Sequence, residues 1–171
     1  MSAYFHSYLC GREAAEWLIF MEEEVNDIAL AGEISALTQG VPHLIANLSN
    51  VSALLWQALP DINWVGFYKR EGNILVLYPF QGKPACIEIP IGRGVCGTAA
   101  ARDEIQLVEN VHHFPGHIAC DSASNSEIVL PLHRNGELWG VLDIDSPTIG
   151  RFTEEDRTKL IAAAYEIEKF L

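Results

Sequence analysis

The sequence predicts an α+β protein: a six-stranded antiparallel sheet with an N-terminal helix pair and a C-terminal helix on one face. Two observations lead to this fold class. Apolar residues recur every three to four positions at both ends of the chain and every second position between them. Short turns typical of hairpins join the central segments in pairs, and hairpin-linked strands form antiparallel sheets.

The N-terminal third of the chain predicts two helices. Apolar residues are spaced by three and four over residues 13–37 and again over residues 44–59, which is the pattern of amphipathic helices. Gly40 and Pro42 end the first helix, and Pro60 ends the second.

Six segments are predicted as strands, the first two because they are rich in aromatic and β-branched residues. They are residues 63–69, 73–80, 87–90, 106–111, 128–133 and 138–144. Glu71-Gly72 joins the first two, and Asn135-Gly136, which suits the positive φ angles of a type I′ turn, joins the last two. A glycine turn over residues 92–97 leads into a short helix.

A C-terminal helix and a single domain complete the prediction. Thr153 and Asp156 resemble a capping box that opens a helix at Glu154. The 171 residues suffice for one domain with its own core. We expect that domain to span residues 1–171, with an extension at 1–12, helices at 13–59, the sheet and site loops at 62–146, and the last helix at 153–171.

Composition and charge exclude several classes of protein. Hydrophobic residues make up 49% and charged residues 20%, which excludes disordered and collagen-like chains. Eleven basic against 23 acidic residues give a net charge of −12, which disfavours binding to nucleic acid or anionic lipid. No secretory signal or apolar run of about 18 residues is apparent, so we expect a cytoplasmic protein with reduced cysteines.

Three cysteines are candidates for redox chemistry. Cys120 lies in a long irregular stretch, residues 110–126, where it is either a reachable thiolate or a small buried filler. Cys96 lies one turn inside the short helix, whose dipole would lower the thiol pKa, or else it only allows close packing. Cys86 follows Gly82-Lys83-Pro84 and is either a mobile resolving thiol or an incidental one.

The histidines of the same stretch offer a different interpretation. His112, His113 and His117 could bind zinc or iron together with Cys120, since imidazole and thiolate are suitable donors. Their spacing matches no established ligand pattern, and neutral histidines that only form hydrogen bonds are the simpler explanation.

Acidic residues on the last hairpin are candidates for binding a cation. In a pleated strand Asp143 and Asp145 share one face while Ile144 points to the other. Together with Glu127 they would be costly unless they were solvated, as at a fraying strand end, or met a ligand ammonium. Four aromatic residues are core residues by default, although one of them could equally form the wall of a small pocket: Trp64, Phe67, Tyr68 and Trp139.

The string GHIACDSASNSEIVLPL, with WVGFYK, GVLDIDSP and the cysteines at positions 86, 96 and 120, resembles the free methionine-(R)-sulfoxide reductases built on a GAF domain. The resemblance extends from about Phe20 to the C-terminus. It implies a GAF fold, a homodimer, and reduction of free methionine sulfoxide to methionine by thiol chemistry without a cofactor. It also implies thioredoxin as the reductant.

The resemblance further implies roles for individual residues. Cys120 would be the attacking thiol, Cys86 the main resolving thiol, and Cys96 a further participant. Trp64 and Tyr68 would line the pocket for the substrate's methyl group. The carboxylates that would hold the ammonium and assist protonation are Glu127, Asp143 and Asp145.

Two other functions remain open from the sequence. One is a GAF sensor that binds a small ligand without catalysis, although such sensors are usually fused to an output domain and 171 residues leave no room for one. The other is a metal-dependent enzyme that uses the histidine stretch.

Overall fold

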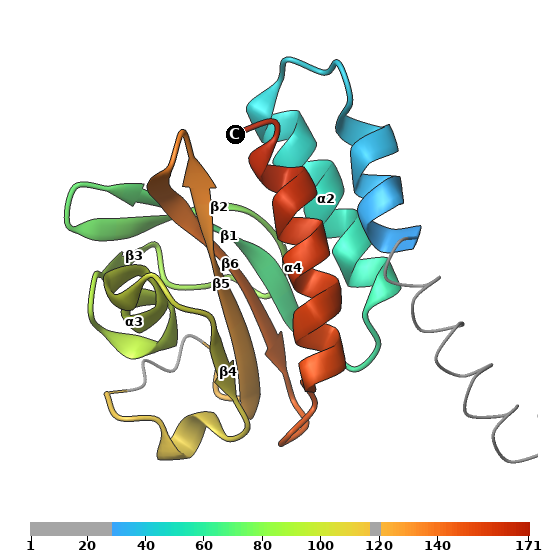
Figure 1. Ribbon diagram of the computed structural model, residues 1–171. Helices are drawn as coiled ribbons and strands as arrows, with labels where there is room; N and C mark the ends of the chain where they lie inside the picture. The colour runs from blue at the N-terminus through green and yellow to red at the C-terminus, as the bar shows by residue number, and fades with distance from the viewer. Residues whose placement is uncertain (1–28, 117–120) are drawn as a thin grey trace, which may run out of the picture.

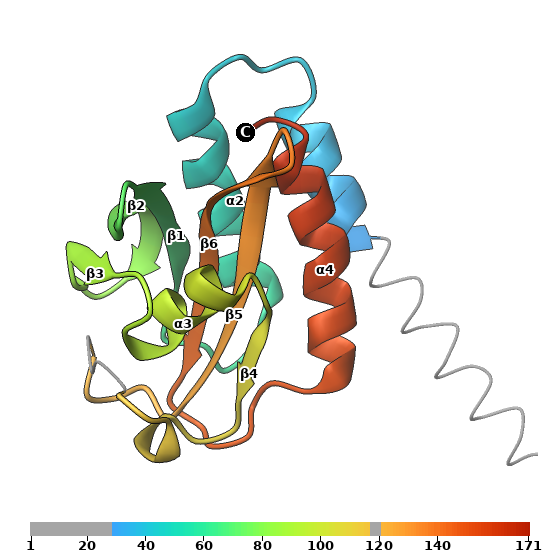
Figure 2. The same cartoon turned by 60° about the vertical axis from the view of Figure 1, so that its left-hand side comes forward.

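The computed structural model describes residues 29–116 and 121–171 (Figure 1). In these residues a six-stranded sheet lies between two helical layers. The helical residues 29–38, α2 (Leu44–Ala58) and α4 (Glu154–Glu168) cover one face, and α3 (Gly94–Arg102) covers the other, as Figures 1 and 2 show together. The predicted α+β class and the helices grouped on one face are confirmed.

The sheet is antiparallel throughout, as predicted. Its strands are β1 (Trp64–Glu71), β2 (Ile74–Gly82), β3 (Glu88–Pro90), β4 (Gln106–Val108), β5 (Ser126–Arg134) and β6 (Glu137–Ser146). They lie in the order β3-β2-β1-β6-β5-β4. The two hairpins therefore meet at the centre of the sheet, where β1 pairs with β6.

The turn between β5 and β6 confirms the prediction made from its dipeptide. Asn135 and Gly136 have φ angles of 55° and 79°. Two consecutive positive φ angles are what a type I′ turn requires, and Asn-Gly tolerates them better than other pairs. Between Leu132 and His133 the register shifts by one residue, and beyond that shift Glu127 pairs with Asp145.

Two predicted boundaries differ from the structure or lie outside it. The fourth strand was expected over residues 106–111 but ends at Val108, because the Asn110 side chain accepts a hydrogen bond from the His112 backbone N–H and caps the 3₁₀ helix η1 (Val111–His113). Residues 13–28 of the first predicted helix, and the extension at 1–12, lie outside the described residues.

The main hydrophobic core lies between the sheet and the larger helical layer. It includes Leu48, Leu55, Phe67, Leu142, Ile144 and Leu160, all of them buried. The α4 helix is fixed at its start by the predicted capping box, in which Thr153 and Asp156 bond to each other's backbone N–H. None of the described helices is long and apolar enough to cross a membrane.

A second, smaller core lies under α3 on the opposite face of the sheet, and it includes Trp64, Tyr68 and Cys96. The helix comes close to the end of β3 because Gly97 has no side chain. A Cβ at Gly97 would collide with the Pro90 carbonyl oxygen. This close approach places the first turn of α3, with Cys96, over β5 and β6.

Candidate active site

Strand register gathers three acidic residues on the α3 face of the sheet. Glu127 on β5 lies opposite Asp145 on β6, and Asp143 lies two residues before Asp145. Ile144, between the two aspartates, is fully buried in the core on the other face. The predicted alternation along this strand is confirmed, and it explains how residues from two strands converge on one point.

Cys96 lies next to these carboxylates, on the first turn of α3, which covers this face of the sheet. Its Sγ lies 3.7 Å from Oε1 of Glu127. One ligand atom each of Cys96, Glu127 and Asp143 lie within 4.8 Å of one another, and all three residues are buried. Together with Asp145 they line a small cavity, with a volume of about 30 Å³, which we call the acidic cavity.

The acidic cavity holds negative charge without a counter-charge. Burial raises the pKa of Asp143 to about 6. Burial also raises the pKa of Glu127 and of Asp145, and the charge of Asp143 adds to both effects. Oδ1 of Asp143 is buried and has no hydrogen-bond partner. No Lys, Arg or His in the described parts of the chain forms an ion pair with these carboxylates, so a cationic ligand would supply what the cavity lacks.

The Cys96 thiol differs from what its helix position predicts. The dipole of α3 was expected to lower its pKa, but burial and the nearby charges of Asp143 and Glu127 raise it well above the usual value. Desolvation and like charge therefore outweigh the helix dipole. Cys96 is a free, buried thiol that favours its protonated form.

Trp64 and Tyr68 support the segment that carries Cys86. Trp64 donates from Nε1 to the Lys83 carbonyl oxygen at 3.1 Å, and Tyr68 donates from its hydroxyl to the Cys86 carbonyl oxygen, also at 3.1 Å. Trp64 stacks on Phe80 with 5.3 Å between ring centroids. Both aromatic residues share the face of the acidic cavity but do not line it.

Two of the four cysteines, Cys86 and Cys96, lie in the part of the chain that the structure describes. Cys86 is disulfide-bonded, in contrast to the free thiol of Cys96. Cys120, the predicted attacking thiol, and Cys10 lie outside the described residues. The structure thus places Cys96 at the acidic cavity and Cys86 at the aromatic pair.

Sequence reasoning missed the residues that fix the loop beside the cavity. Lys83 Nζ lies 3.1 Å from Oδ2 of Asp121, and Oδ1 of Asp121 accepts a hydrogen bond from the Ala123 N–H at 2.9 Å. These contacts hold the pKa of Asp121 below its usual value. Asn63 donates from Nδ2 to the Ser124 hydroxyl at 3.1 Å. No periodicity links these positions, because each pair joins loops far apart in the sequence.

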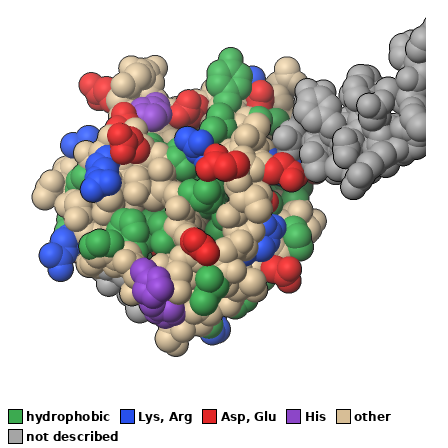
Figure 3. All heavy atoms as spheres, turned by 60° about the horizontal axis from the view of Figure 1, so that its bottom comes forward, with side chains coloured by type: hydrophobic (Ala, Val, Ile, Leu, Met, Phe, Trp, Pro, Cys, Tyr) green, Lys and Arg blue, Asp and Glu red, His purple; other side chains and the backbone are tan. Residues whose placement is uncertain are grey.

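The histidine stretch does not form a metal site within the described residues. His112 and His113 are exposed, and Nε2 of His112 is 2.7 Å from Oδ1 of Asn125. Figure 3 shows histidine side chains gathered on the surface of the molecule. His117 lies outside the described residues. The one described group with metal-ligand geometry is Cys96, Glu127 and Asp143.

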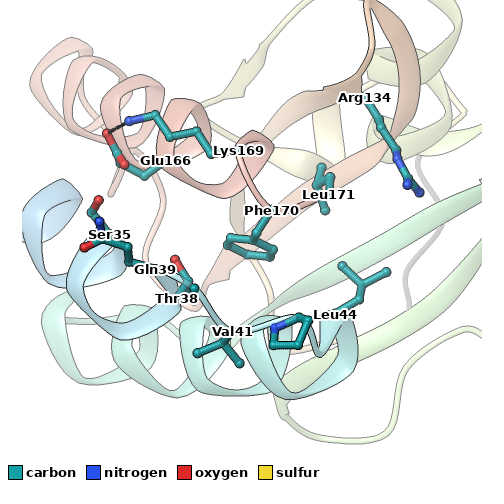
Figure 4. Close-up of a pocket in the computed structure, with 12 residues that line it drawn as sticks. Ser35, Thr38, Gln39, Val41, Leu44, Arg134, Glu166, Lys169, Phe170 and Leu171 are labelled. Carbon is teal, nitrogen blue, oxygen red and sulfur yellow. Dashed lines mark hydrogen bonds and ion pairs between the residues drawn. The ribbon is translucent and has the colours of Figure 1, made fainter.

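A larger cavity, of about 720 Å³, lies away from the predicted site (Figure 4). It is lined by residues of the loop before α2 and of the chain's C-terminus, including Val41, Phe170 and Leu171. Among its charged residues, Glu166 and Lys169 pair with each other at 2.6 Å. Its lining includes no cysteine, and its one acidic residue, Glu166, has a counter-charge, so the acidic cavity is the better candidate for thiol chemistry.

Comparisons with known proteins show what the chain is similar to. The GAF domain family profile matches residues 33–170. The free methionine-R-sulfoxide reductase of Escherichia coli (strain K12) is 57% identical over 139 residues, covering 81% of this chain and 84% of that protein. The reductase of the same name from Saccharomyces cerevisiae is 45% identical over 156 residues, covering 86% of each. The structure of fRMsr of Staphylococcus aureus in complex with substrate has a TM-score of 0.81 and 51% identity, covering 85% of this chain and 95% of that one.

Proposed function

This chain belongs to the GAF-domain free methionine-R-sulfoxide reductase family, and on that basis we propose that it reduces free L-methionine-(R)-sulfoxide to L-methionine. The observation that carries the proposal is the acidic cavity. It offers buried carboxylates without a counter-charge, as a site for the ammonium of a free amino acid requires.

The proposed chemistry uses two cysteines in turn. The Cys120 thiolate attacks the sulfoxide sulfur while the sulfoxide oxygen is protonated. Methionine then leaves, and the oxygen remains on Cys120 as a sulfenic acid. The Cys86 thiol condenses with this sulfenic acid, which forms a disulfide and releases water. The disulfide bond at Cys86 supports a redox role for this residue.

The remaining residues bind and orient the substrate in this proposal. Glu127, Asp143 and Asp145 hold the ammonium. Asp143 is the proton donor, because burial raises its pKa to about 6, nearer to the neutral pH at which a general acid works. The methyl group lies against Trp64 and Tyr68. Cys96 takes part as a buried thiol beside the carboxylates.

The cellular setting is part of the proposal. Thioredoxin would reduce the disulfide by thiol exchange and return the enzyme to its starting state. The protein would act as a homodimer in the cytoplasm, where such reductants operate.

A thioredoxin-coupled assay with the separate R and S isomers of free methionine sulfoxide tests the activity. We expect turnover of the R isomer only. Single-turnover assays without reductant then separate the thiols: Cys120→Ser should release no methionine, because a serine hydroxyl offers almost no anion at neutral pH. Cys86→Ser should release about one equivalent per site and stall as a sulfenic acid.

The same assays can contradict the proposal. If neither isomer is consumed, the proposed function is wrong. If Cys120→Ser releases methionine and Cys96→Ser does not, the reductase function stands but the attacking thiol is Cys96.

A further inference from the structure

We propose that Cys96, Glu127 and Asp143 form a binding site for a single Zn²⁺ ion, which excludes the substrate's ammonium from the acidic cavity. The three residues supply one thiolate and two carboxylate oxygens, all of them donors that zinc accepts. Cation binding at this cavity does not depend on the proposed function, whereas its effect as an inhibitor does.

The distances suit zinc with little movement of the side chains. In a tetrahedral zinc site with a thiolate and a carboxylate ligand, the sulfur and oxygen lie about 3.5 Å apart. Cys96 Sγ and Glu127 Oε1 are already 3.7 Å apart. One ligand atom each of Cys96, Glu127 and Asp143 lie within 4.8 Å of one another. A small rotation of the Asp143 side chain would therefore bring all three atoms to the distances that a bound zinc ion requires.

An unsatisfied oxygen points to a missing ligand. Asp143 is only 6% exposed, and its Oδ1 has no hydrogen-bond partner in the described structure. A buried carboxylate oxygen without a partner is unfavourable, and coordination of a cation removes that cost. This observation is independent of the clustering of acidic residues.

The donor set selects the kind of ion. A thiolate and two carboxylates face the small acidic cavity. Mg²⁺ and Ca²⁺ prefer shells of oxygen ligands and water, so the thiolate disfavours both. Zn²⁺ needs four ligands and binds thiolate well, and Asp145, which also lines the cavity, or one water can be the fourth.

Occupation by zinc and by an ammonium would be mutually exclusive. Both cations would be held by the Glu127 and Asp143 carboxylates, in a cavity with room for one of them. Zinc would also hold the Cys96 thiol as a thiolate, which releases its proton on binding. The enzyme would therefore lose affinity for its substrate where free zinc rises.

Cadmium titration of the oxidised protein tests the site. Cd²⁺ resembles Zn²⁺ in its preference for sulfur and gives an ultraviolet charge-transfer band when bound to thiolate. The oxidised protein is used because Cys86 is then in its disulfide and does not compete. We expect one equivalent of Cd²⁺ to bind with a thiolate band, and Zn²⁺ to displace it.

Variants and a competitor complete the test. Cys96→Ser should abolish the band, and Asp143→Asn, which keeps the thiol, should weaken binding by roughly 100-fold or more. Cys10→Ser and Glu88→Gln, an exposed carboxylate on β3, should leave binding unchanged. Free methionine sulfoxide should displace the ion, and its N-acetyl derivative should not.

The failure of the zinc site and the failure of the proposed reductase function have different outcomes. Binding that does not saturate at one equivalent, or that survives in Asp143→Asn, would overturn the zinc site. Tight binding in a protein that does not turn over methionine sulfoxide would leave the zinc site standing and overturn the proposed function instead.

Discussion

Asp143, the proposed proton donor, is unfavourable for the fold when it is ionised. Its raised pKa means that the ionised form is less stable in the folded protein than in the unfolded chain. Glu127 shares this property. A group that is retained at such a cost is more easily explained by ligand binding than by stability.

Neutral replacements of these carboxylates should therefore separate activity from stability. Asp143→Asn and Glu127→Gln should lower kcat/KM for free methionine sulfoxide by about 100-fold or more, because an ammonium would lose its buried partner. The free energy of unfolding should stay unchanged or rise, by an amount on the order of 1 to 3 kcal/mol for Asp143. Urea denaturation at neutral pH and steady-state kinetics measure both quantities.

Glu88→Gln is the matched control, since Glu88 is an exposed carboxylate on the same sheet. It should change neither quantity. Retention of near wild-type kcat/KM in both buried variants would mean that the acidic cavity does not bind the ammonium.

Single residues differed in how far the sequence could predict them. Strand alternation placed Asp143 and Asp145 on one face correctly, because the side-chain period of a strand follows from backbone geometry alone. The pKa of Cys96 was predicted in the wrong direction, since it depends on burial and on charges from β5 and β6, which are distant in the sequence. The contact between Lys83 and Asp121 spans 38 residues and had no local pattern.

At the level of elements, α3 depends on its close contact with the end of β3. Gly97→Ala should destabilise the protein by about 1 to 3 kcal/mol, because the new methyl group would meet the backbone oxygen of Pro90, which cannot move aside. Thermal or urea unfolding measures the change. Gly32→Ala, at an exposed helical position with free space around it, should instead stabilise by about 0.5 to 1 kcal/mol.

The Gly97 prediction fails if both alanine variants stabilise the protein alike. In that case the first turn of α3 could shift freely, and the position of Cys96 over the carboxylates would not depend on this glycine.

The link between Lys83 and Asp121 joins the segment that carries Cys86 to the loop beside the acidic cavity. Lys83 is largely exposed, so Lys83→Met should change the free energy of unfolding by less than about 1 kcal/mol. In single-turnover assays Lys83→Met should leave methionine release unchanged. It should prolong the lifetime of the Cys120 sulfenic acid, because the segment that carries Cys86, the proposed resolving thiol, is then no longer held by the ion pair. Trapping with a dimedone-type reagent measures that lifetime.

Lys69→Met is the control for this pair, since Lys69 forms a similar exposed contact with Glu71. An equal sulfenic acid lifetime in wild type, Lys83→Met and Lys69→Met would show that the ion pair has no part in resolution.

His133 ties β5 to α3 and α4. Its Nε2 is 2.8 Å from Oδ1 of Asp103, and its Nδ1 is 3.0 Å from Oε1 of Glu168. Burial alone would lower its pKa, but the hydrogen bonds to these two carboxylates outweigh it and raise the pKa. The protonated histidine therefore stabilises the fold at a pH below the unfolded value of about 6.5, and this stabilisation disappears as pH rises through the higher folded value.

The pH dependence of unfolding tests this link. The difference in free energy of unfolding between wild type and His133→Gln should be largest in weakly acidic solution and shrink as the pH rises above neutrality. The effect should be below about 1 kcal/mol, because the side chain is one-third exposed. A difference that grows with pH would contradict the sign.

Most elements were predictable because their determinants are local. The Asn135-Gly136 turn and the Thr153 cap each act within a few residues, and the structure confirms both. The fourth strand was predicted too long, since its end depends on a side chain that competes with the sheet for a backbone N–H.

For the whole molecule, the order β3-β2-β1-β6-β5-β4 is what creates the site. It places both hairpins side by side, so that β1 holds the Cys86 segment through its aromatic residues while β5 and β6 supply the carboxylates. The sequence predicted the antiparallel sheet but not this order, because pairing between distant strands has no local signature. The antiparallel pairing of β1 with β6 thus brings the thiol segment and the acidic cavity onto one face.

The central claim is that the acidic cavity recognises the free ammonium of the substrate. The most direct test compares kcat/KM for free L-methionine-(R)-sulfoxide with that for its N-acetyl derivative, in which a neutral, bulkier amide replaces the positively charged ammonium. We predict a preference for the free amino acid of about 100-fold or more, equivalent to about 2.7 kcal/mol, and loss of most of that preference in Asp143→Asn. Equal kcat/KM values for the two compounds in the wild-type protein would contradict the account.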